Sequence, residues 1–296
     1  MKGFRLWIAA MVAMLLVGCS GKRESERLVS VTIEPQRFFA ERIAGDRFEI
    51  NCVVPAGQSP ESYDPTPREM MRLGSGVAYL RIGNIGFEQA WMERIIEANP
   101  DMAIYDLSKG VDLIKSTEDH HDGEADEHHH HHHGDTDPHI WSSISGAKII
   151  AKNTLDAFVD LDPNGESIYR ENYQKLLVEI ETVEREVKEL LDSVDRRTFI
   201  IYHPALTYFA AEFDLKQLCI EMDGKEPSPA QLKLLVDTAR DHDAAVVFVQ
   251  REFDQKNAEI IAKEAGCRLI TINPLNYNWD KEMIHIAKSL AYGKID

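Results

Sequence analysis

A single apolar stripe in residues 165–194 constrains the fold of this chain more than any other feature. Its members recur at alternating spacings of four and three, which places them on one face of an α-helix. They are Tyr169, Tyr173, Leu176, Ile180, Val183, Val187, Leu190 and Val194. A helix of about 30 residues extends roughly 45 Å, as long as a whole domain. Such a helix must bury its stripe either in a coiled-coil dimer or along two lobes of one chain.

Short segments typical of strands and helices alternate on both sides of this helix. Apolar and β-branched runs predict strands at 29–33, 48–54, 77–82 and 102–105, and again at 198–202, 216–220, 245–249 and 268–272. Segments typical of helices lie between these strands, and such an alternation predicts parallel sheets flanked by helices. We therefore expect an α/β fold with two similar lobes, 28–160 and 197–296, joined by a long helix within 161–196. This arrangement favours a monomer over the coiled coil.

The N-terminus has the pattern of an export signal. Lys2 and Arg5 precede an apolar stretch at 6–17, and Cys19 follows Leu-Val-Gly. This stretch is short for a membrane helix and fits a signal peptide. We expect a lipoprotein signal at 1–18, acylation of Cys19 and a spacer at 19–27, with an ordinary secretory signal as the alternative. The protein is then anchored to the bacterial cell envelope, periplasmic or on the outer surface, through its lipid alone.

The net charge and the spacing of the cysteines limit the partners and the kinds of site that this chain can have. The formal net charge of −17 argues against nucleic acid and anionic lipid surfaces as partners, because both require clustered Lys and Arg. It suits a protein that attracts cations. Cys52, Cys219 and Cys267 lie beyond the signal, and without a C-x-x-C spacing they predict neither a thiolate zinc site nor a redox motif. One disulfide, with Cys219 and Cys267 as its pair, and buried free thiols both remain open.

Residues 118–137 hold eight histidines and eight acidic residues in twenty positions. The histidines are His120, His121, His128, His129, His130, His131, His132 and His133. His-rich tracts bind metal ions, so we expect a weak auxiliary metal site here. High charge and the lack of apolar residues predict a disordered loop over 107–137.

Three loops at expected strand ends offer isolated metal ligands. The first carries Glu61, the second His139 and the third His203. Open α/β sheets place their ligand sites at such loops, and two imidazoles with one carboxylate form a set that transition metals accept. The same set also describes hydrolytic zinc centres, but H-E-x-x-H is absent, and we expect no enzyme. A metal held by all three loops would lie in a cleft between the lobes.

The chain resembles the solute-binding proteins of zinc and manganese ABC importers, the ZnuA/TroA-like family, over nearly all of the mature sequence. The resemblance rests on VSVTIEPQRFFAERIAGDRFEI, VPAGQSPESYDPTP, GNIGFEQAW, DPHIW, YHPALTYFAAEF, MDGKEPSPAQL and VVFVQREF. It implies two α/β lobes bridged by a rigid helix, a metal in the cleft between them, and delivery of that metal to an ABC transporter permease. His139 and His203 match metal-ligating histidines of the family.

Glu61 departs from the family pattern. The zinc-type members have histidine at this position, and a carboxylate makes the site harder and shifts its preference toward manganese or iron. The fourth ligand is open: water, the second oxygen of Glu61, or Asn276. Two features favour zinc: the His-rich loop, and the sequence Asn273-Pro274-Leu275, which is closer to the zinc-type members of the family. We therefore expect Zn²⁺ as the transported ligand, with Mn²⁺ or Fe²⁺ as alternatives, and a metal-buffering or adhesin lipoprotein as the alternative function.

Overall fold

The computed structural model describes residues 27–115, 136–221, 227–253 and 255–292. The expected signal peptide, Cys19 and the histidines of 118–133 lie outside these ranges. In the described part of the chain, no helix is both long and apolar enough to span a membrane.

Each lobe is built on a four-stranded parallel sheet. The N-terminal lobe comprises β1 (Leu28–Val31), α2 (Glu34–Ala44), β2 (Glu49–Cys52), α3 (Pro67–Gly74), β3 (Ala78–Arg81), α4 (Gly86–Ala98), β4 (Ala103–Asp106) and α5 (Ile144–Leu161). After α6 (Glu166–Leu191) come β5 (Thr198–Ile201), α7 (Thr207–Glu212), β6 (Lys216–Cys219), α8 (Pro229–Asp241), β7 (Val246–Gln250), α9 (Gln255–Ala265), β8 (Arg268–Ile272) and α10 (Trp279–Ala291). All eight predicted strands are present, most of them shorter than expected.

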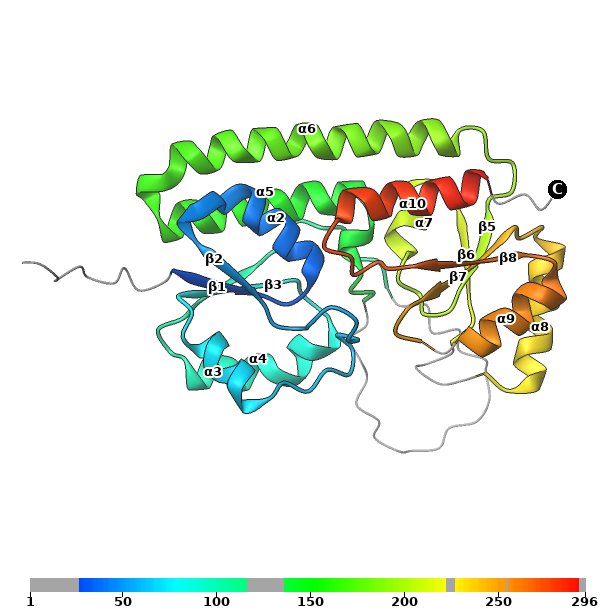
Figure 1. Ribbon diagram of the computed structural model, residues 1–296, viewed down its shortest axis with the longest axis horizontal. Helices are drawn as coiled ribbons and strands as arrows, with labels where there is room; N and C mark the ends of the chain where they lie inside the picture. Colours follow the sequence, from blue (N-terminus) through cyan, green and yellow to red (C-terminus); the bar gives the residue numbers. More distant parts are fainter. Residues whose placement is uncertain (1–26, 116–135, 222–226, 254, 293–296) are drawn as a thin grey trace, which may run out of the picture.

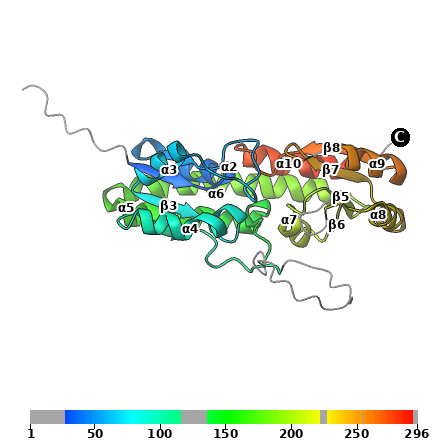
Figure 2. The ribbon, with the colours of Figure 1, turned by 90° about the horizontal axis from the view of Figure 1, so that it is seen from below.

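The two sheets share one topology. Their strand orders are β2-β1-β3-β4 and β6-β5-β7-β8, so each lobe repeats the same pattern of crossovers. In the first sheet, Val29 pairs with Ile50 on one side and with Ala78 on the other, both in parallel. Figure 1 shows helices on both faces of each sheet, and Figure 2 shows the lobes side by side along α6. The predicted α/β fold of two similar lobes is confirmed.

The long helix α6 packs along both lobes. It contacts α2 and α5 of the N-terminal lobe and α10 of the C-terminal lobe (Figure 1). Its buried residues are Tyr169, Leu176, Ile180, Val183, Val187 and Leu191, nearly the predicted stripe. The helix ends at Leu191, three residues earlier than expected. Val194 is still buried because the chain turns back there, with its N–H donating to the Leu191 carbonyl at 3.1 Å.

Two tryptophans tie the lobes together. Trp141 Nε1 donates to the carbonyl of Pro274 at 2.9 Å, and Trp279 Nε1 donates to the carbonyl of Trp141 at 2.7 Å. The Trp279 ring also packs against Phe38 and Phe39 of α2, with ring centroids 6.2 and 5.3 Å away. All of these rings are buried in one hydrophobic core that includes residues of both lobes. The lobes therefore hold a fixed relation in which loops from each can form one site.

The prediction of a disordered loop over 107–137 is wrong at both ends of that range. Leu107 is buried, the Ile114 N–H donates to the Tyr208 hydroxyl at 3.1 Å, and the Asp137 N–H donates to the Ile114 carbonyl at 2.8 Å. Lys115 and Thr136 form an isolated antiparallel bridge. Because scattered apolar residues in 107–115 pack against the core, the average polarity of the segment was misleading.

The cysteines of the described chain are free. Cys52 and Cys219 are half-buried and Cys267 is buried. Burial raises the pKa of the Cys219 thiol to about 12. The structure thus agrees with free thiols and not with a Cys219–Cys267 disulfide.

Candidate metal site

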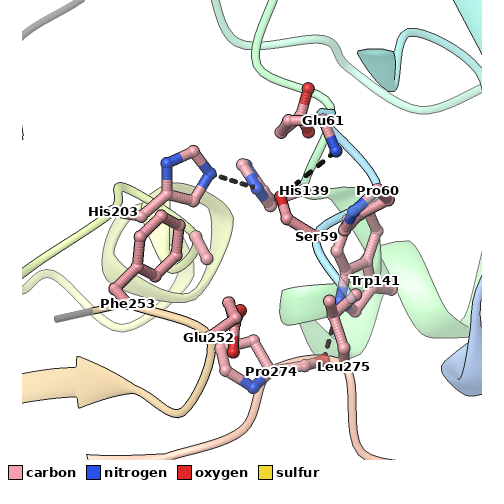
Figure 3. Close-up of a pocket in the computed structure, with 11 residues that line it drawn as sticks. Ser59, Pro60, Glu61, His139, Trp141, His203, Glu252, Phe253, Pro274 and Leu275 are labelled. Carbon is pink, nitrogen blue, oxygen red and sulfur yellow. Dashed lines mark hydrogen bonds between the residues drawn. The ribbon is translucent and has the colours of Figure 1, made fainter. Parts of the chain in front are cut away.

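The three predicted ligands meet in a pocket where the carboxyl ends of strands from both lobes face each other. Glu61 lies on the loop after β2, His139 at the end of the long segment after β4, and His203 two residues after the end of β5. Loops after β7 and β8 complete the pocket through Phe253 and Pro274 (Figure 3). The parallel topology causes this convergence, because the carboxyl ends of parallel strands lie at one edge of each sheet.

The helix α4 holds one oxygen of Glu61. The N–H of Gly86, the first residue of α4, donates to Glu61 Oε2 at 3.1 Å. A Cβ at position 86 would lie 2.6 Å from the Glu61 carbonyl oxygen and 2.7 Å from Oε2, so this approach requires glycine. Glu61 Oε1 is buried and has no hydrogen-bond partner among the described residues. A buried carboxylate oxygen without a partner is costly, so this atom is available for a cation.

Asp137 orients the imidazole of His139. His139 is 5 % exposed, and its Nδ1 lies 2.9 Å from Asp137 Oδ1, which also accepts the backbone N–H of His139 at 2.8 Å. Burial acts to lower the pKa of His139, but attraction and hydrogen bonding to Asp137, together with attraction to Glu61 and Glu221, outweigh it, so the pKa is raised above its ordinary value. Since a carboxylate only accepts, Nδ1 carries a proton and Nε2 points into the pocket.

His203 is fixed in a similar way from the C-terminal lobe. Its Nδ1 lies 2.9 Å from Oε2 of Glu221, a residue on the segment after β6. The side-chain amide of Gln250 donates to the His203 carbonyl at 2.7 Å and accepts the His203 backbone N–H at 3.3 Å. The ring of Phe253 stacks on the imidazole, with centroids 5.3 Å apart. Both histidines thus have the carboxylate–imidazole pairing that orients metal ligands in proteins.

The ligand atoms converge on one point. The Nε2 atoms of His139 and His203 are 3.2 Å apart, and both lie within 4.8 Å of a Glu61 oxygen (Figure 3). Two nitrogens on one tetrahedral zinc, each about 2.0–2.1 Å from the ion, would be about 3.3–3.4 Å apart. With both Nδ1 atoms protonated, the two Nε2 lone pairs face each other. Only a cation or a proton between them makes this arrangement favourable.

Asn276, the remaining residue that the sequence offered as a ligand, lies away from this point. Asn276 does not line the pocket: its Nδ2 donates to Glu282 Oε2 at 3.1 Å, and its Oδ1 accepts the Asn278 N–H at 3.0 Å. These local bonds turn the amide away, so the structure does not support Asn276 as a ligand.

Sequence reasoning missed two residues that orient the histidines, Asp137 and Glu221. The Asp-x-His spacing was a signal for the first, whereas nothing local links Glu221 to His203.

Fold and site together define a two-lobed solute-binding protein with a cleft suited to a metal ion. A family model described as "ZnuA: Zinc-uptake complex component A periplasmic" matches residues 29–291. The chain belongs to the ZnuA family.

Relatives with different metals resemble this chain. It is 26 % identical over 282 residues to the "High-affinity zinc uptake system protein ZnuA" of Bacillus subtilis, covering 91 % of this chain and 88 % of that protein. It is 23 % identical over 270 residues to the "Manganese-binding lipoprotein MntA" of Halalkalibacterium halodurans, covering 88 % and 85 %. A crystal structure of ZnuA matches with a TM-score of 0.81 and 32 % identity, covering 89 % of this chain and 97 % of that one.

Proposed function

We propose that this protein captures one divalent transition-metal ion, with zinc as the first choice, in the cell envelope and delivers it to an ABC importer permease. Glu61, His139 and His203 are the proposed ligands. One observation carries the proposal: two imidazole lone pairs face each other across 3.2 Å beside a buried, unpartnered carboxylate oxygen. Capture without catalysis is the activity proposed, and the similarity to relatives named for metal uptake and metal binding supports it.

The metal preference follows from the donor set. Two imidazole nitrogens suit zinc, and the carboxylate of Glu61 adds an oxygen that manganese and iron accept more readily than a third imidazole. Similarity to relatives named for zinc and for manganese supports both ions. We keep zinc as the first choice because imidazoles form two of the three ligands.

The histidine tract of 118–133 serves, in this proposal, as a weak collector of ions. Its flanks lead directly to the site, because Asp137, which orients His139, follows the Lys115–Thr136 bridge. Deletion of 118–133 should leave one tight zinc site per chain and remove only weaker binding. Calorimetric titration of metal-free protein with zinc, with and without the deletion, measures this. Complete loss of tight binding in the deletion would place the high-affinity site in the tract and contradict the cleft proposal.

Protons should compete with the metal. Metal binding needs a free Nε2 on both imidazoles. Because Asp137 raises the pKa of His139, protonation sets in at a higher pH than for an ordinary imidazole near 6.5. Below that raised pKa, the apparent zinc affinity should fall about tenfold per pH unit for one competing proton. Titrations in a buffer series from about pH 8 to pH 6 test the sign, and an affinity independent of pH would contradict it.

Export and delivery belong to the same proposal. Cys19 is the proposed lipid attachment site, and the similarity to a protein named as a lipoprotein supports it. Mass spectrometry of the mature chain tests the acylation. Uptake of radioactive zinc by cells lacking the gene separates delivery from buffering or adhesion: reduced uptake supports delivery, and unchanged uptake contradicts it.

A further inference from the structure

The site at Glu61, His139 and His203 supplies three donors, one fewer than a tetrahedral ion takes. The other residues that line the pocket are mostly apolar or aromatic. Ser59 has a hydroxyl, which accepts the Glu61 N–H at 3.3 Å, but a neutral hydroxyl is outside the usual Cys, His and carboxylate ligands of zinc. Glu252 is the one further carboxylate among the lining residues, and Figure 3 places it across the pocket from Glu61.

Resting on the function proposed above, we propose that Glu252 is a metal ligand of this site and closes its fourth position with a carboxylate oxygen. Its carboxylate lies outside the cluster of three ligands. Binding therefore requires rotation of the Glu252 side chain toward the ion, with the backbone of its loop in place.

That loop is firmly joined to His203. Two residues before Glu252, the Gln250 side chain is hydrogen-bonded to both the N–H and the carbonyl of His203. One residue after it, the Phe253 ring stacks on the imidazole, and the Phe253 N–H donates to the Gln250 carbonyl at 3.2 Å. The contacts that position His203 for the metal thus also fix the backbone on either side of Glu252.

Charge favours the same assignment. No Lys or Arg is among the residues that line the pocket. Burial raises the pKa of Glu252, partly offset by its own backbone N–H and by His203, so the carboxylate is poorly solvated where it stands. A divalent ion with two carboxylates and two neutral imidazoles has no net charge in its first shell. With Glu61 alone that shell would keep one positive charge in a partly desolvated pocket, which is less favourable.

The experiment compares zinc and manganese affinities of the full-length protein with those of Glu252→Gln, and uses Co²⁺ absorption to report coordination. Glu259→Gln is the matched control, because it makes the same charge change at an exposed position on α9. Glu252→Gln should weaken binding of both ions at least about tenfold, the scale on which even outer partners of a metal matter, and should alter the Co²⁺ spectrum. Manganese, which prefers oxygen donors, should lose more than zinc.

An unchanged affinity and Co²⁺ spectrum in Glu252→Gln, or a loss equal to that of Glu259→Gln, would overturn the ligand role. Failure of the unaltered protein to bind any of the three ions would instead overturn the proposed function. The two failures are therefore distinguishable.

Discussion

His203→Ala should weaken zinc binding by about 1000-fold or more, equivalent to about 4 kcal/mol. The substitution removes one of three converging donors and leaves Glu221 without the imidazole N–H that it accepts. Within the cluster of three, the remaining pair, Glu61 and His139, comes from the N-terminal lobe alone. Competition of metal-free protein against a chelator of known zinc affinity measures the loss.

A matched control separates the site from general effects of losing a histidine. His285 is exposed on α10, where its Nε2 lies 3.2 Å from the Thr271 carbonyl. His285→Ala should keep the affinity of the unaltered protein. Thermal melting of both metal-free variants shows whether they fold. If folded His203→Ala binds zinc as tightly as His285→Ala does, the cleft is not the metal site.

Trp279→Ala should lower the free energy of unfolding by about 3–5 kcal/mol, the usual cost of deleting a large buried side chain. Trp279 is 1 % exposed and packs on Phe38 and Phe39 of the other lobe. The substitution also leaves the carbonyl of Trp141 without its donor in the core. Urea unfolding of the metal-free protein measures the change.

The same substitution should weaken zinc binding, because Trp279 helps to fix the relative position of the two lobes, and each lobe carries part of the ligand set. Tyr292→Ala is the control: Tyr292 is 66 % exposed, and its loss should change stability by less than about 0.5 kcal/mol. Stability of Trp279→Ala equal to that of the Tyr292→Ala control would show that the tryptophan contact contributes little to joining the lobes.

The fold was predictable because its signals are local and periodic. The α6 stripe needs only the 3.6-residue repeat, and the strands need only short apolar and β-branched runs. Boundaries were less accurate. Val194 keeps the spacing of the stripe although the helix has ended, because burial in a turn gives the same pattern as burial on a helix face.

The site was predictable in part. Glu61, His139 and His203 could be singled out because each stands on a loop at a strand end, and the structure brings them together. Asn276 was left open as a fourth ligand together with water and the second oxygen of Glu61. Its neighbours Pro274 and Leu275 line the pocket, but its own amide is held by Glu282 and Asn278. A position in sequence does not give the direction of a side chain.

Residue type and short-range periodicity were enough to predict two α/β lobes with parallel sheets along one helix, and the chemistry of the donors. Which of these groups face the same point depended on how the chain folds in three dimensions. Three features bring together loops of different elements. They are the contact of Glu221 with His203, the hydrogen bond from the Gly86 N–H to Glu61, and the position of Glu252 in the lining of the pocket. Such contacts depend on how sheets and helices pack in space, and no local pattern records that packing.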